Sequence, residues 1–286
     1  MKRFRQRLEA MAARAIWAVF GLLPLDVASA LGGGLARMVG PLLGVNRIAR
    51  RNLVRALPDK TEAEIAAILR GMWDNLGRVA GEFPHLEEIA ATRVDLVGGE
   101  SIDLLRDDGK AGIFISGHVG NWELGGAVAA VRGLNLHLVY RAANNPWIED
   151  LYRKGRKSAA VALIQKGSEG ARQALLALKK GNHLGMLVDQ KMNDGVPIPF
   201  FGRDAMTAPA VAQFATRFKC PLVPARVERL DGANFRVTVY PPMEFPHTED
   251  GHDDNRLLLI RINELLESWI RERPDQWLWV HRRWPE

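Results

Sequence analysis

The sequence predicts an α/β fold, with a largely parallel mixed sheet flanked by helices and preceded by a helical N-terminal segment. Two observations favour this fold. From Val94 onward, short apolar segments alternate with stretches of helical periodicity, which is the pattern of a parallel sheet covered by helices. The first 55 residues instead combine an apolar run with ten Lys and Arg and only two acidic residues. We therefore expect one α/β domain over residues 46–286, behind an N-terminal segment of residues 1–45.

The N-terminal segment has the features of a membrane-associated helix. Its apolar run, residues 15–25, is shorter than the roughly 20 residues that a membrane span needs, and Pro24, Asp26 and a cluster of glycines interrupt its continuation. A local charge excess of +8 over residues 1–55 attracts anionic lipid head groups. We therefore expect a helix that lies in one leaflet of an anionic membrane surface rather than a clean single-pass span.

A secretory signal is the alternative interpretation of this segment, because Ala28, Ser29 and Ala30 follow a basic start and an apolar core. The basic segment is long for a signal, however, and positive charge continues over residues 47–55. We therefore expect the protein to remain on the cytoplasmic face of the membrane.

Composition and missing motifs exclude several classes of protein. A hydrophobic content of 47% and a charged content of 25% exclude global disorder. The single cysteine, Cys220, excludes an internal disulfide and a cysteine metal site. The sequence contains no glycine-rich nucleotide loop, no His-Glu-x-x-His, no Gly-x-Ser-x-Gly and no signature of a nucleic-acid-binding module. We therefore expect no metal, no bound cofactor and no nucleic-acid partner.

The individual elements follow from periodicity and capping. Thr61 and Glu64 form a capping box at the start of a helix whose apolar stripe, with Trp73, is expected in the core. Strands are expected at residues 112–116, 136–140, 161–164 and 184–188, and helices at 121–132, 147–157, 169–180, 207–218 and 255–271. The segments 222–227 and 235–240 are expected to pair and complete the sheet.

A histidine follows the first of the buried strands, between Gly117 and Gly120, at the edge where open α/β sheets present their ligands. Glu123 comes five residues after His118, and in the first turn of a helix that starts near Asn121 its carboxylate would reach one ring nitrogen. A histidine oriented in this way can accept a proton from a hydroxyl that attacks an acyl carbon. The alternative is a non-catalytic helix start, in which His118 caps the helix and Glu123 favours its positive end.

The motif His-x4-Glu after an Ile-rich strand resembles the signature of the lysophospholipid acyltransferase superfamily, and "HVGNWELGG" resembles its late lipid A acyltransferases. Further segments are similar to later blocks of that family, in the same order. These segments are "RRNLVRALP" (Arg50 to Pro58), "VYRAANNP" (Val139 to Pro146), "DQ…PFFG" (Asp189 to Gly202) and "DQWLWVHRRW" (Asp275 to Trp284). Together these segments extend over most of the chain, so the resemblance does not depend on His-x4-Glu alone.

The resemblance implies a membrane-associated O-acyltransferase in which His118 is the general base and Glu123 orients it. It also implies that a fatty acyl chain is transferred to a hydroxyl of a lipid A precursor at the inner membrane. The donor is then acyl-acyl carrier protein or, as the alternative co-substrate, acyl-CoA. The acceptor can instead be a lysophospholipid or a mannosylated inositol lipid. A non-catalytic membrane-surface binding protein is the alternative from a different class.

Four further residues are expected to bind substrate. They are Asn121, Arg141, Arg156 and Asp189. Both arginines can present guanidinium groups to a phosphate or an acyl oxyanion, and the resemblance places Arg156 and Asp189 at the family's functional arginine and aspartate. The family often has a histidine after that aspartate, whereas this chain has Gln190.

Two aromatic segments remain open to more than one interpretation. Phe200 and Phe201 belong to a stiff apolar stretch and either line an acyl-chain slot or pack in the core. The Trp-rich tail, residues 277–284, alternates like an inward-facing strand, and its arginines suit a membrane interface. His281, without an acidic neighbour in sequence, is expected to be structural.

Overall fold

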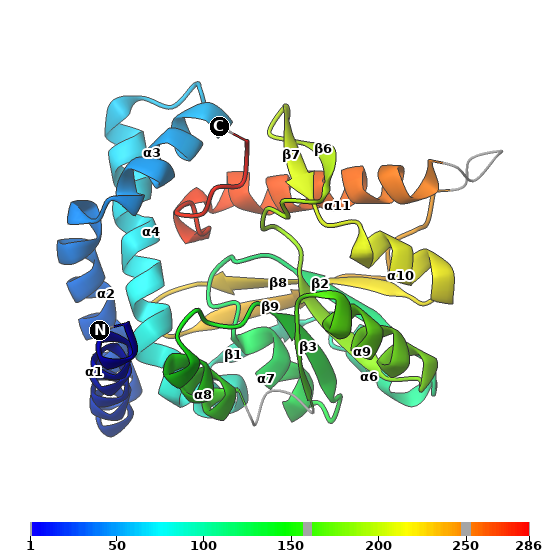
Figure 1. The fold of residues 1–286 in the computed structure, drawn as a ribbon, viewed down its shortest axis with the longest axis horizontal. Coiled ribbons are helices and arrows are strands. Elements are labelled where there is room, and N and C mark those ends of the chain that lie inside the picture. The colour runs from blue at the N-terminus through cyan, green and yellow to red at the C-terminus, as the bar shows by residue number, and fades with distance from the viewer. Residues whose placement is uncertain (1, 157–161, 247–252, 286) are drawn as a thin grey trace.

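A computed structural model describes residues 2–156, 162–246 and 253–285 (Figure 1). The strands are β1 (Val94–Val97), β2 (Ile113–Ser116), β3 (Leu136–Tyr140), β4 (Ala162–Gln165), β5 (His183–Leu187), β6 (Val196–Phe200), β7 (Arg203–Thr207), β8 (Leu222–Arg229) and β9 (Phe235–Val239). The α-helices are α1 (Lys2–Leu22), α2 (Leu25–Val39), α3 (Val45–Ala56), α4 (Glu62–Glu82), α5 (Leu86–Thr92), α6 (Glu100–Asp107), α7 (Leu124–Val131), α8 (Pro146–Gly155), α9 (Ser168–Lys179), α10 (Ala210–Phe218) and α11 (Asp254–Glu272). Three short 3₁₀ helices are η1 (Gly40–Leu42), η2 (Phe83–His85) and η3 (Pro274–Gln276).

The main sheet has seven strands in the order β1-β9-β8-β2-β5-β3-β4. All its pairings are parallel except that of β8 with β9. The prediction of a largely parallel mixed sheet flanked by helices is therefore confirmed. The predicted strand pair is present as β8 and β9, but it lies inside the sheet, because β1 adds a further strand beyond β9. The last residue of the predicted helix 147–157 and the first residue of the predicted strand 161–164 lie outside the described residues.

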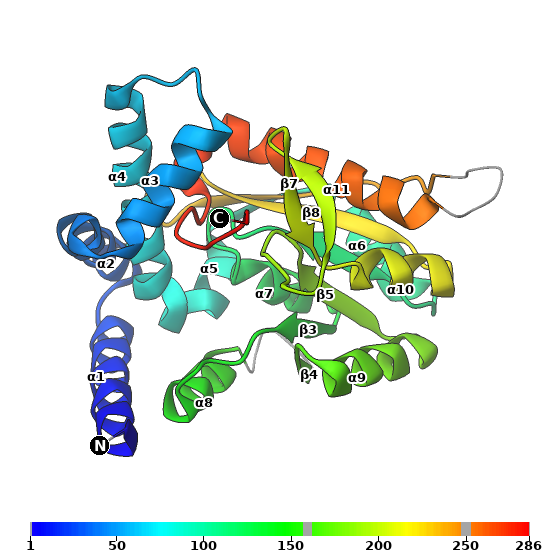
Figure 2. The ribbon, with the colours of Figure 1, turned by 45° about the horizontal axis from the view of Figure 1, so that its top comes forward.

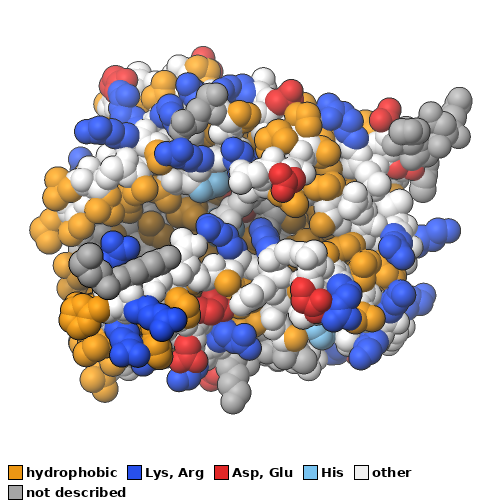
Figure 3. All heavy atoms as spheres, viewed as in Figure 1, with side chains coloured by type: hydrophobic (Ala, Val, Ile, Leu, Met, Phe, Trp, Pro, Cys, Tyr) orange, Lys and Arg blue, Asp and Glu red, His pale blue; other side chains and the backbone are white. Residues whose placement is uncertain are grey.

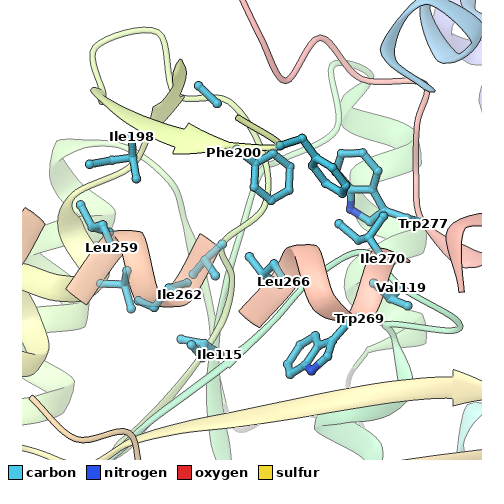
Figure 4. Packing of buried hydrophobic residues seen from close by; sticks show 14 of the residues in the cluster. Ile115, Val119, Ile198, Phe200, Leu259, Ile262, Leu266, Trp269, Ile270 and Trp277 are labelled. Atoms are coloured by element: carbon cyan, nitrogen blue, oxygen red, sulfur yellow. The ribbon is translucent and has the colours of Figure 1, made fainter. Parts of the chain in front are cut away.

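Alternate residues of the central strands enter two separate cores. On β2, Ile113 and Ile115 pack into a cluster that includes residues of α9, α10 and α11, whereas Phe114 packs into a cluster with residues of α5, α6 and α7. This alternation follows from the two-residue period of a strand. Figure 4 shows the first cluster, where side chains of α11 meet Ile115 from the sheet and Phe200 from β6. Helices thus cover both faces and leave the strand ends as the open edge.

The N-terminal helices α2 and α4 pack closely through glycines. A Cβ placed on Gly32 would lie 2.3 Å from the carbonyl oxygen of Gly77, so no larger residue fits at this crossing. The capping box of α4 forms as predicted, with Thr61 accepting from the Glu64 backbone N–H and Glu64 accepting from the Thr61 backbone N–H. Figure 2 shows α1 extending away from the sheet beside this helix pair. The N-terminal segment is therefore attached to the α/β domain by close helix packing.

Among the described residues, no single helix is both long and apolar enough to cross a membrane. One pair, residues 25–42 with residues 45–56, passes that test together, but its two parts are bent by 88°.

Three regions differ from the sequence-based expectations. Residues 196–207 form the hairpin β6–β7, so the helix expected at 207–218 begins only at Ala210. The Trp-rich tail forms no strand beyond a single bridge between Trp277 and Val119. Its expected membrane-interface position is wrong, because Trp277, Trp279 and Trp284 are buried against Phe200 and Phe201. The two phenylalanines therefore pack in the core instead of lining a slot.

Candidate active site

The loop that follows β2 carries His118 and depends on a glycine for its course. Gly120 has a φ of +57°, and a Cβ at this position would lie 2.4 Å from the carbonyl oxygen of Val227. Any other residue would be strained and would also clash with β8. Gly120 thus brings the loop down onto the neighbouring strand and presents His118 at the carboxyl end of the parallel strands.

The partner of His118 is Asp189, not Glu123. The Nδ1 atom of His118 lies 2.7 Å from Oδ1 of Asp189, and the backbone N–H of His118 donates to Oδ2 over 2.8 Å. Strands β2 and β5 are adjacent, and Ser116 pairs with Leu187. His118 and Asp189 each follow this pair by two residues, so they lie side by side. The predicted pairing of His118 with Glu123 is therefore wrong. Helix α7 begins at Leu124, which leaves Glu123 before its first turn.

Asp189 is fully buried and is held by three donors. Besides the two contacts with His118, its Oδ2 accepts from the indole Nε1 of Trp277 over 2.8 Å. Burial raises the pKa of the Asp189 carboxyl, but the His118 imidazole outweighs this effect through charge and hydrogen bonding, aided by His281, so the pKa falls well below its usual value. Asp189 is therefore a fixed negative charge beneath the imidazole.

Gln190 occupies the other side of the ring. Its amide Nε2 lies 3.2 Å from Nε2 of His118. A proton on Nδ1, facing Asp189, leaves Nε2 as the acceptor, and the Gln190 amide is a donor that suits this tautomer. The residue that departs from the family pattern thus still contacts the histidine.

Glu123 pairs with Arg156 from the end of α8. The guanidinium donates from Nε to Oε2 over 2.7 Å and from Nη2 to Oε1 over 2.6 Å. The Arg156 guanidinium also lies over the rings of Tyr140 and Tyr152. Burial lowers the pKa of Arg156, but the hydrogen bonds and charge of Glu123 outweigh it and the pKa is raised. The two residues form a two-point ion pair beside His118.

Asn121 faces the interior of the protein. It is fully buried, donates from its amide to Oε2 of Glu82 over 2.9 Å, and accepts from the backbone N–H of Glu123. Glu82, on α4, also accepts from Ser29 of α2 and from Arg229 of β8. Asn121 therefore supports Glu123 from behind, a position different from the substrate contact expected of it.

Two hollows meet at the Glu123–Arg156 pair. A polar pocket of about 360 Å³ has His118, Arg141 and Lys166 in its wall. An apolar cavity of about 100 Å³ runs between the sheet and α7, lined by side chains such as Phe114, Leu136 and Ala129. Glu123 borders the cavity and Arg156 borders both hollows. Figure 3 shows Lys and Arg side chains bordering a hollowed part of the face that it views.

The described residues include no group of three or more His, Cys, Asp and Glu side chains placed to hold a metal ion. His281 is half-buried, donates from Nδ1 to the Leu278 carbonyl over 2.8 Å and packs against Trp277. Burial lowers the pKa of His281, which favours a neutral ring. Its position below the site agrees with the structural role expected of it.

Three residues of this site were not expected from the sequence. Glu82 and Trp277 contact the site from elements far away in the chain, and no local pattern marks them. Lys166 carried a usable signal, because it directly follows a strand, at the edge where His118 and Arg141 also follow theirs.

Comparisons with known proteins identify the family of this chain. The sequence profile of a family described as bacterial lipid A biosynthesis acyltransferase matches residues 3–286. A lipid A biosynthesis palmitoleoyltransferase of Escherichia coli K12 is 26% identical over 91% of this chain and 86% of its own length. The lauroyltransferase of the same pathway in that organism is 26% identical over 94% and 88%, and the myristoyltransferase is 25% identical over 86% and 77%. The chain, an acyltransferase, therefore belongs to the bacterial lipid A biosynthesis acyltransferase family.

Proposed function

We propose that this acyltransferase transfers a fatty acyl chain from acyl-acyl carrier protein to a hydroxyl of a lipid A precursor, at the cytoplasmic face of the inner membrane. The observation that carries the proposal is the His118–Asp189 pair at the floor of a pocket that borders an apolar cavity. This combination suits a reaction between a polar hydroxyl and an acyl chain. The names of the relatives supply the class of acceptor.

The chemistry begins with proton removal from the acceptor. The acceptor hydroxyl replaces the Gln190 amide at Nε2 of His118. Nε2 then accepts the hydroxyl proton while the hydroxyl oxygen attacks the thioester carbon, and Asp189 stabilises the imidazolium that forms. The tetrahedral intermediate then collapses, the carbon–sulfur bond breaks, and the imidazolium returns the proton to the departing thiolate. General-base catalysis of this type contributes about 10²–10⁴-fold. No covalent acyl-enzyme is needed.

Arg156 is the donor for the charge that develops on the thioester oxygen. Its guanidinium borders both hollows, so a carbonyl at their junction would lie beside it. Glu123 occupies Nε and one terminal nitrogen of the fork and thereby fixes its direction. Preorganised donors of this kind act without the cost of reorienting during the reaction. Glu123 thus serves the reaction through Arg156 and not through the histidine.

The apolar cavity is the proposed site of the acyl chain. Its walls come from the Phe114 face of the sheet and from α7, where the small glycine and alanine residues leave room. Each methylene that leaves water there contributes about 0.8 kcal/mol. The thioester end of a chain bound there would lie at the Glu123–Arg156 pair, next to His118.

The N-terminal helices supply the proposed membrane contact. On α2 and the turn after it, Val27, Leu31, Leu35, Met38 and Leu42 recur every three or four residues, and all are exposed. Figure 3 shows hydrophobic side chains gathered at the left edge, where Figure 1 places α1 and α2. Arginines of the same segment suit anionic lipid head groups. The basic border of the pocket likewise suits an acidic carrier protein.

Reconstitution tests the proposal. The purified protein in mixed micelles is given acyl-acyl carrier protein and either a lipid A precursor, a lysophospholipid or a mannosylated inositol lipid, and the products are identified by mass spectrometry. We expect one added acyl chain on the lipid A precursor and none with His118→Ala. Faster transfer to either of the other lipids would identify that lipid as the acceptor in place of the lipid A precursor. No transfer to any of the three lipids would refute the proposed reaction.

A further inference from the structure

Two cations stand side by side at the open edge of the sheet, one after each of two adjacent strands. Tyr140 of β3 pairs with Gln165 of β4, and the backbone N–H of Lys166 donates to the Tyr140 carbonyl over 2.8 Å. The parallel ladder therefore continues one step past both strands. Because neighbouring strands lie about 4.8 Å apart, Arg141 and Lys166 leave the sheet as direct neighbours.

Both side chains line the pocket that contains His118. Arg156 lines it too, but Glu123 compensates its charge. No aspartate or glutamate lines this pocket among the residues that the structure describes. Arg141 has a contact with the Asn144 side-chain oxygen at 3.3 Å, and over the same residues neither Arg141 nor Lys166 has an ion pair. Two like charges thus face one pocket without a counter-charge in its wall.

The nearby carboxylates are committed elsewhere. Glu149 accepts from the Tyr140 hydroxyl and from the backbone N–H of Ala143. Asp189 lies beneath His118. Desolvation lowers the pKa of Lys166, Asp189 raises it, and Arg141 lowers it further. Neighbouring like charges are unfavourable in the free protein, so this arrangement favours an anionic ligand.

We propose that Arg141 and Lys166 form a phosphate subsite that binds a phosphate group of the acceptor lipid. The subsite rests on the proposed function, because it assumes that the acceptor reacts in this pocket. A guanidinium fork paired with a lysine point charge suits a phosphate, which has several oxygens and a high charge density. Recognition of this group would orient the acceptor so that its hydroxyl meets Nε2 of His118.

The donor also contains a phosphate, on the arm that links the acyl chain to its carrier. That phosphate is separated from the thioester by the whole length of an extended arm, whereas Arg141 and Lys166 share one pocket of about 360 Å³ with His118. With the thioester next to His118, the donor phosphate would lie outside the pocket. The acceptor is therefore the source that the geometry favours.

A binding measurement tests the subsite without requiring turnover. In the His118→Ala background, the affinity of a phosphorylated lipid A precursor is compared with that of the same lipid after enzymatic dephosphorylation, for Arg141→Gln, Lys166→Gln and Lys166→Arg. We expect each glutamine variant to weaken binding of the phosphorylated lipid about tenfold and to leave the dephosphorylated lipid unchanged. Lys166→Arg retains the charge and should bind nearly as well as the parent protein. Lys180→Gln, an exposed lysine beyond the far end of α9, is the matched control.

The donor is tested separately with acyl-phosphopantetheine and acyl-pantetheine. Equal affinities of the glutamine variants and the parent for the phosphorylated lipid would overturn the subsite. A loss confined to acyl-phosphopantetheine would overturn its assignment to the acceptor. A selective loss for the phosphorylated lipid supports the subsite even if no acyl transfer is detected, so failure of the proposed function and failure of the subsite are distinguishable.

Discussion

The Glu123 carboxylate and the Arg156 guanidinium share two hydrogen bonds, of 2.6 and 2.7 Å, at the junction of the polar pocket and the apolar cavity. We predict that Arg156→Ala lowers kcat about 10²–10³-fold, the usual effect of losing one oxyanion donor. Arg156→Lys should lose much of this activity as well, because an ammonium group cannot form the two-point contact. Steady-state kinetics with an acyl donor of fixed chain length measures both.

Glu123→Ala should act through Arg156, so Glu123→Ala combined with Arg156→Ala should lose little more than Arg156→Ala alone. If Glu123→Ala instead couples with His118→Ala and is independent of Arg156, Glu123 acts on the histidine directly.

His118 and Asp189 should behave as one catalytic unit. We predict that His118→Ala and Asp189→Asn each lower kcat about 10²–10⁴-fold, because the first removes the base and the second removes the charge that stabilises the imidazolium. The double variant should be no slower than His118→Ala. Circular dichroism verifies that each variant is folded. Additive losses would show that the two residues act independently.

The buried pair Glu82–Arg229 should be a large contributor to stability. Glu82 is fully buried, and Glu82→Gln would leave the Arg229 guanidinium without its charged partner. We predict a loss of about 3–5 kcal/mol in the free energy of unfolding, measured by denaturant titration. The matched control is Asp95→Asn, which breaks an exposed ion pair with Arg236 and should cost about 0–1 kcal/mol. Similar losses in the two variants would contradict the prediction.

Gly125 provides a test of the acyl cavity. It borders the cavity on α7, and a Cβ built there meets no atom within 4 Å. Gly125→Leu should therefore fold and fill part of the cavity, shifting the preferred acyl chain to fewer carbons. Gly125→Ala is the control and should stabilise α7 by roughly 1 kcal/mol through its helix propensity. The measurement is kcat/KM over a series of acyl chain lengths, and an equal loss at every length would argue against a chain site in this cavity.

The exposed stripe on the N-terminal helices should determine membrane binding. Leu42 is 83% exposed and Leu35 is also exposed, so replacing both with Gln leaves the α2–α4 contact intact. Because burying a leucine contributes about 1.5–3 kcal/mol, the partition coefficient on anionic vesicles should fall at least tenfold. Leu104→Gln changes a leucine on α6 whose exposure, 60%, lies between those of Leu35 and Leu42, and it should have no effect. Unchanged flotation of the double variant with vesicles would locate the membrane contact elsewhere.

The alternating pattern of the sequence predicted the sheet because buried parallel strands are short, apolar and separated by helices. His118 and Asp189 both follow predicted strands, 112–116 and 184–188, and the carboxyl ends of parallel strands meet at one edge of the sheet. The pattern does not specify which strands are neighbours. The pattern therefore could not predict the pairing of β2 with β5, which brings His118 to Asp189. It favours the nearest acid in sequence, Glu123, as the partner of His118.

The hairpin β6–β7 and the tail were missed for a different reason. Pro197 and Pro199 lower the strand signal of β6, although this two-stranded element tolerates them. The tail alternates large and polar residues like a strand but packs its tryptophans without a neighbouring strand. Alternation shows which side chains are buried and does not show whether the backbone is paired.

The indole of Trp277 completes the hydrogen bonding of Asp189, and the Leu278 backbone N–H donates to the His118 carbonyl over 3.2 Å. The hydrogen bonding around His118 and Asp189 is thus completed by residues that are synthesised about 90 positions after Asp189 and 160 after His118. A nascent chain without these residues contains His118 and Asp189, but the Asp189 carboxylate lacks the donor that Trp277 supplies. The geometry of the proposed base is therefore complete only after the C-terminal residues have been synthesised.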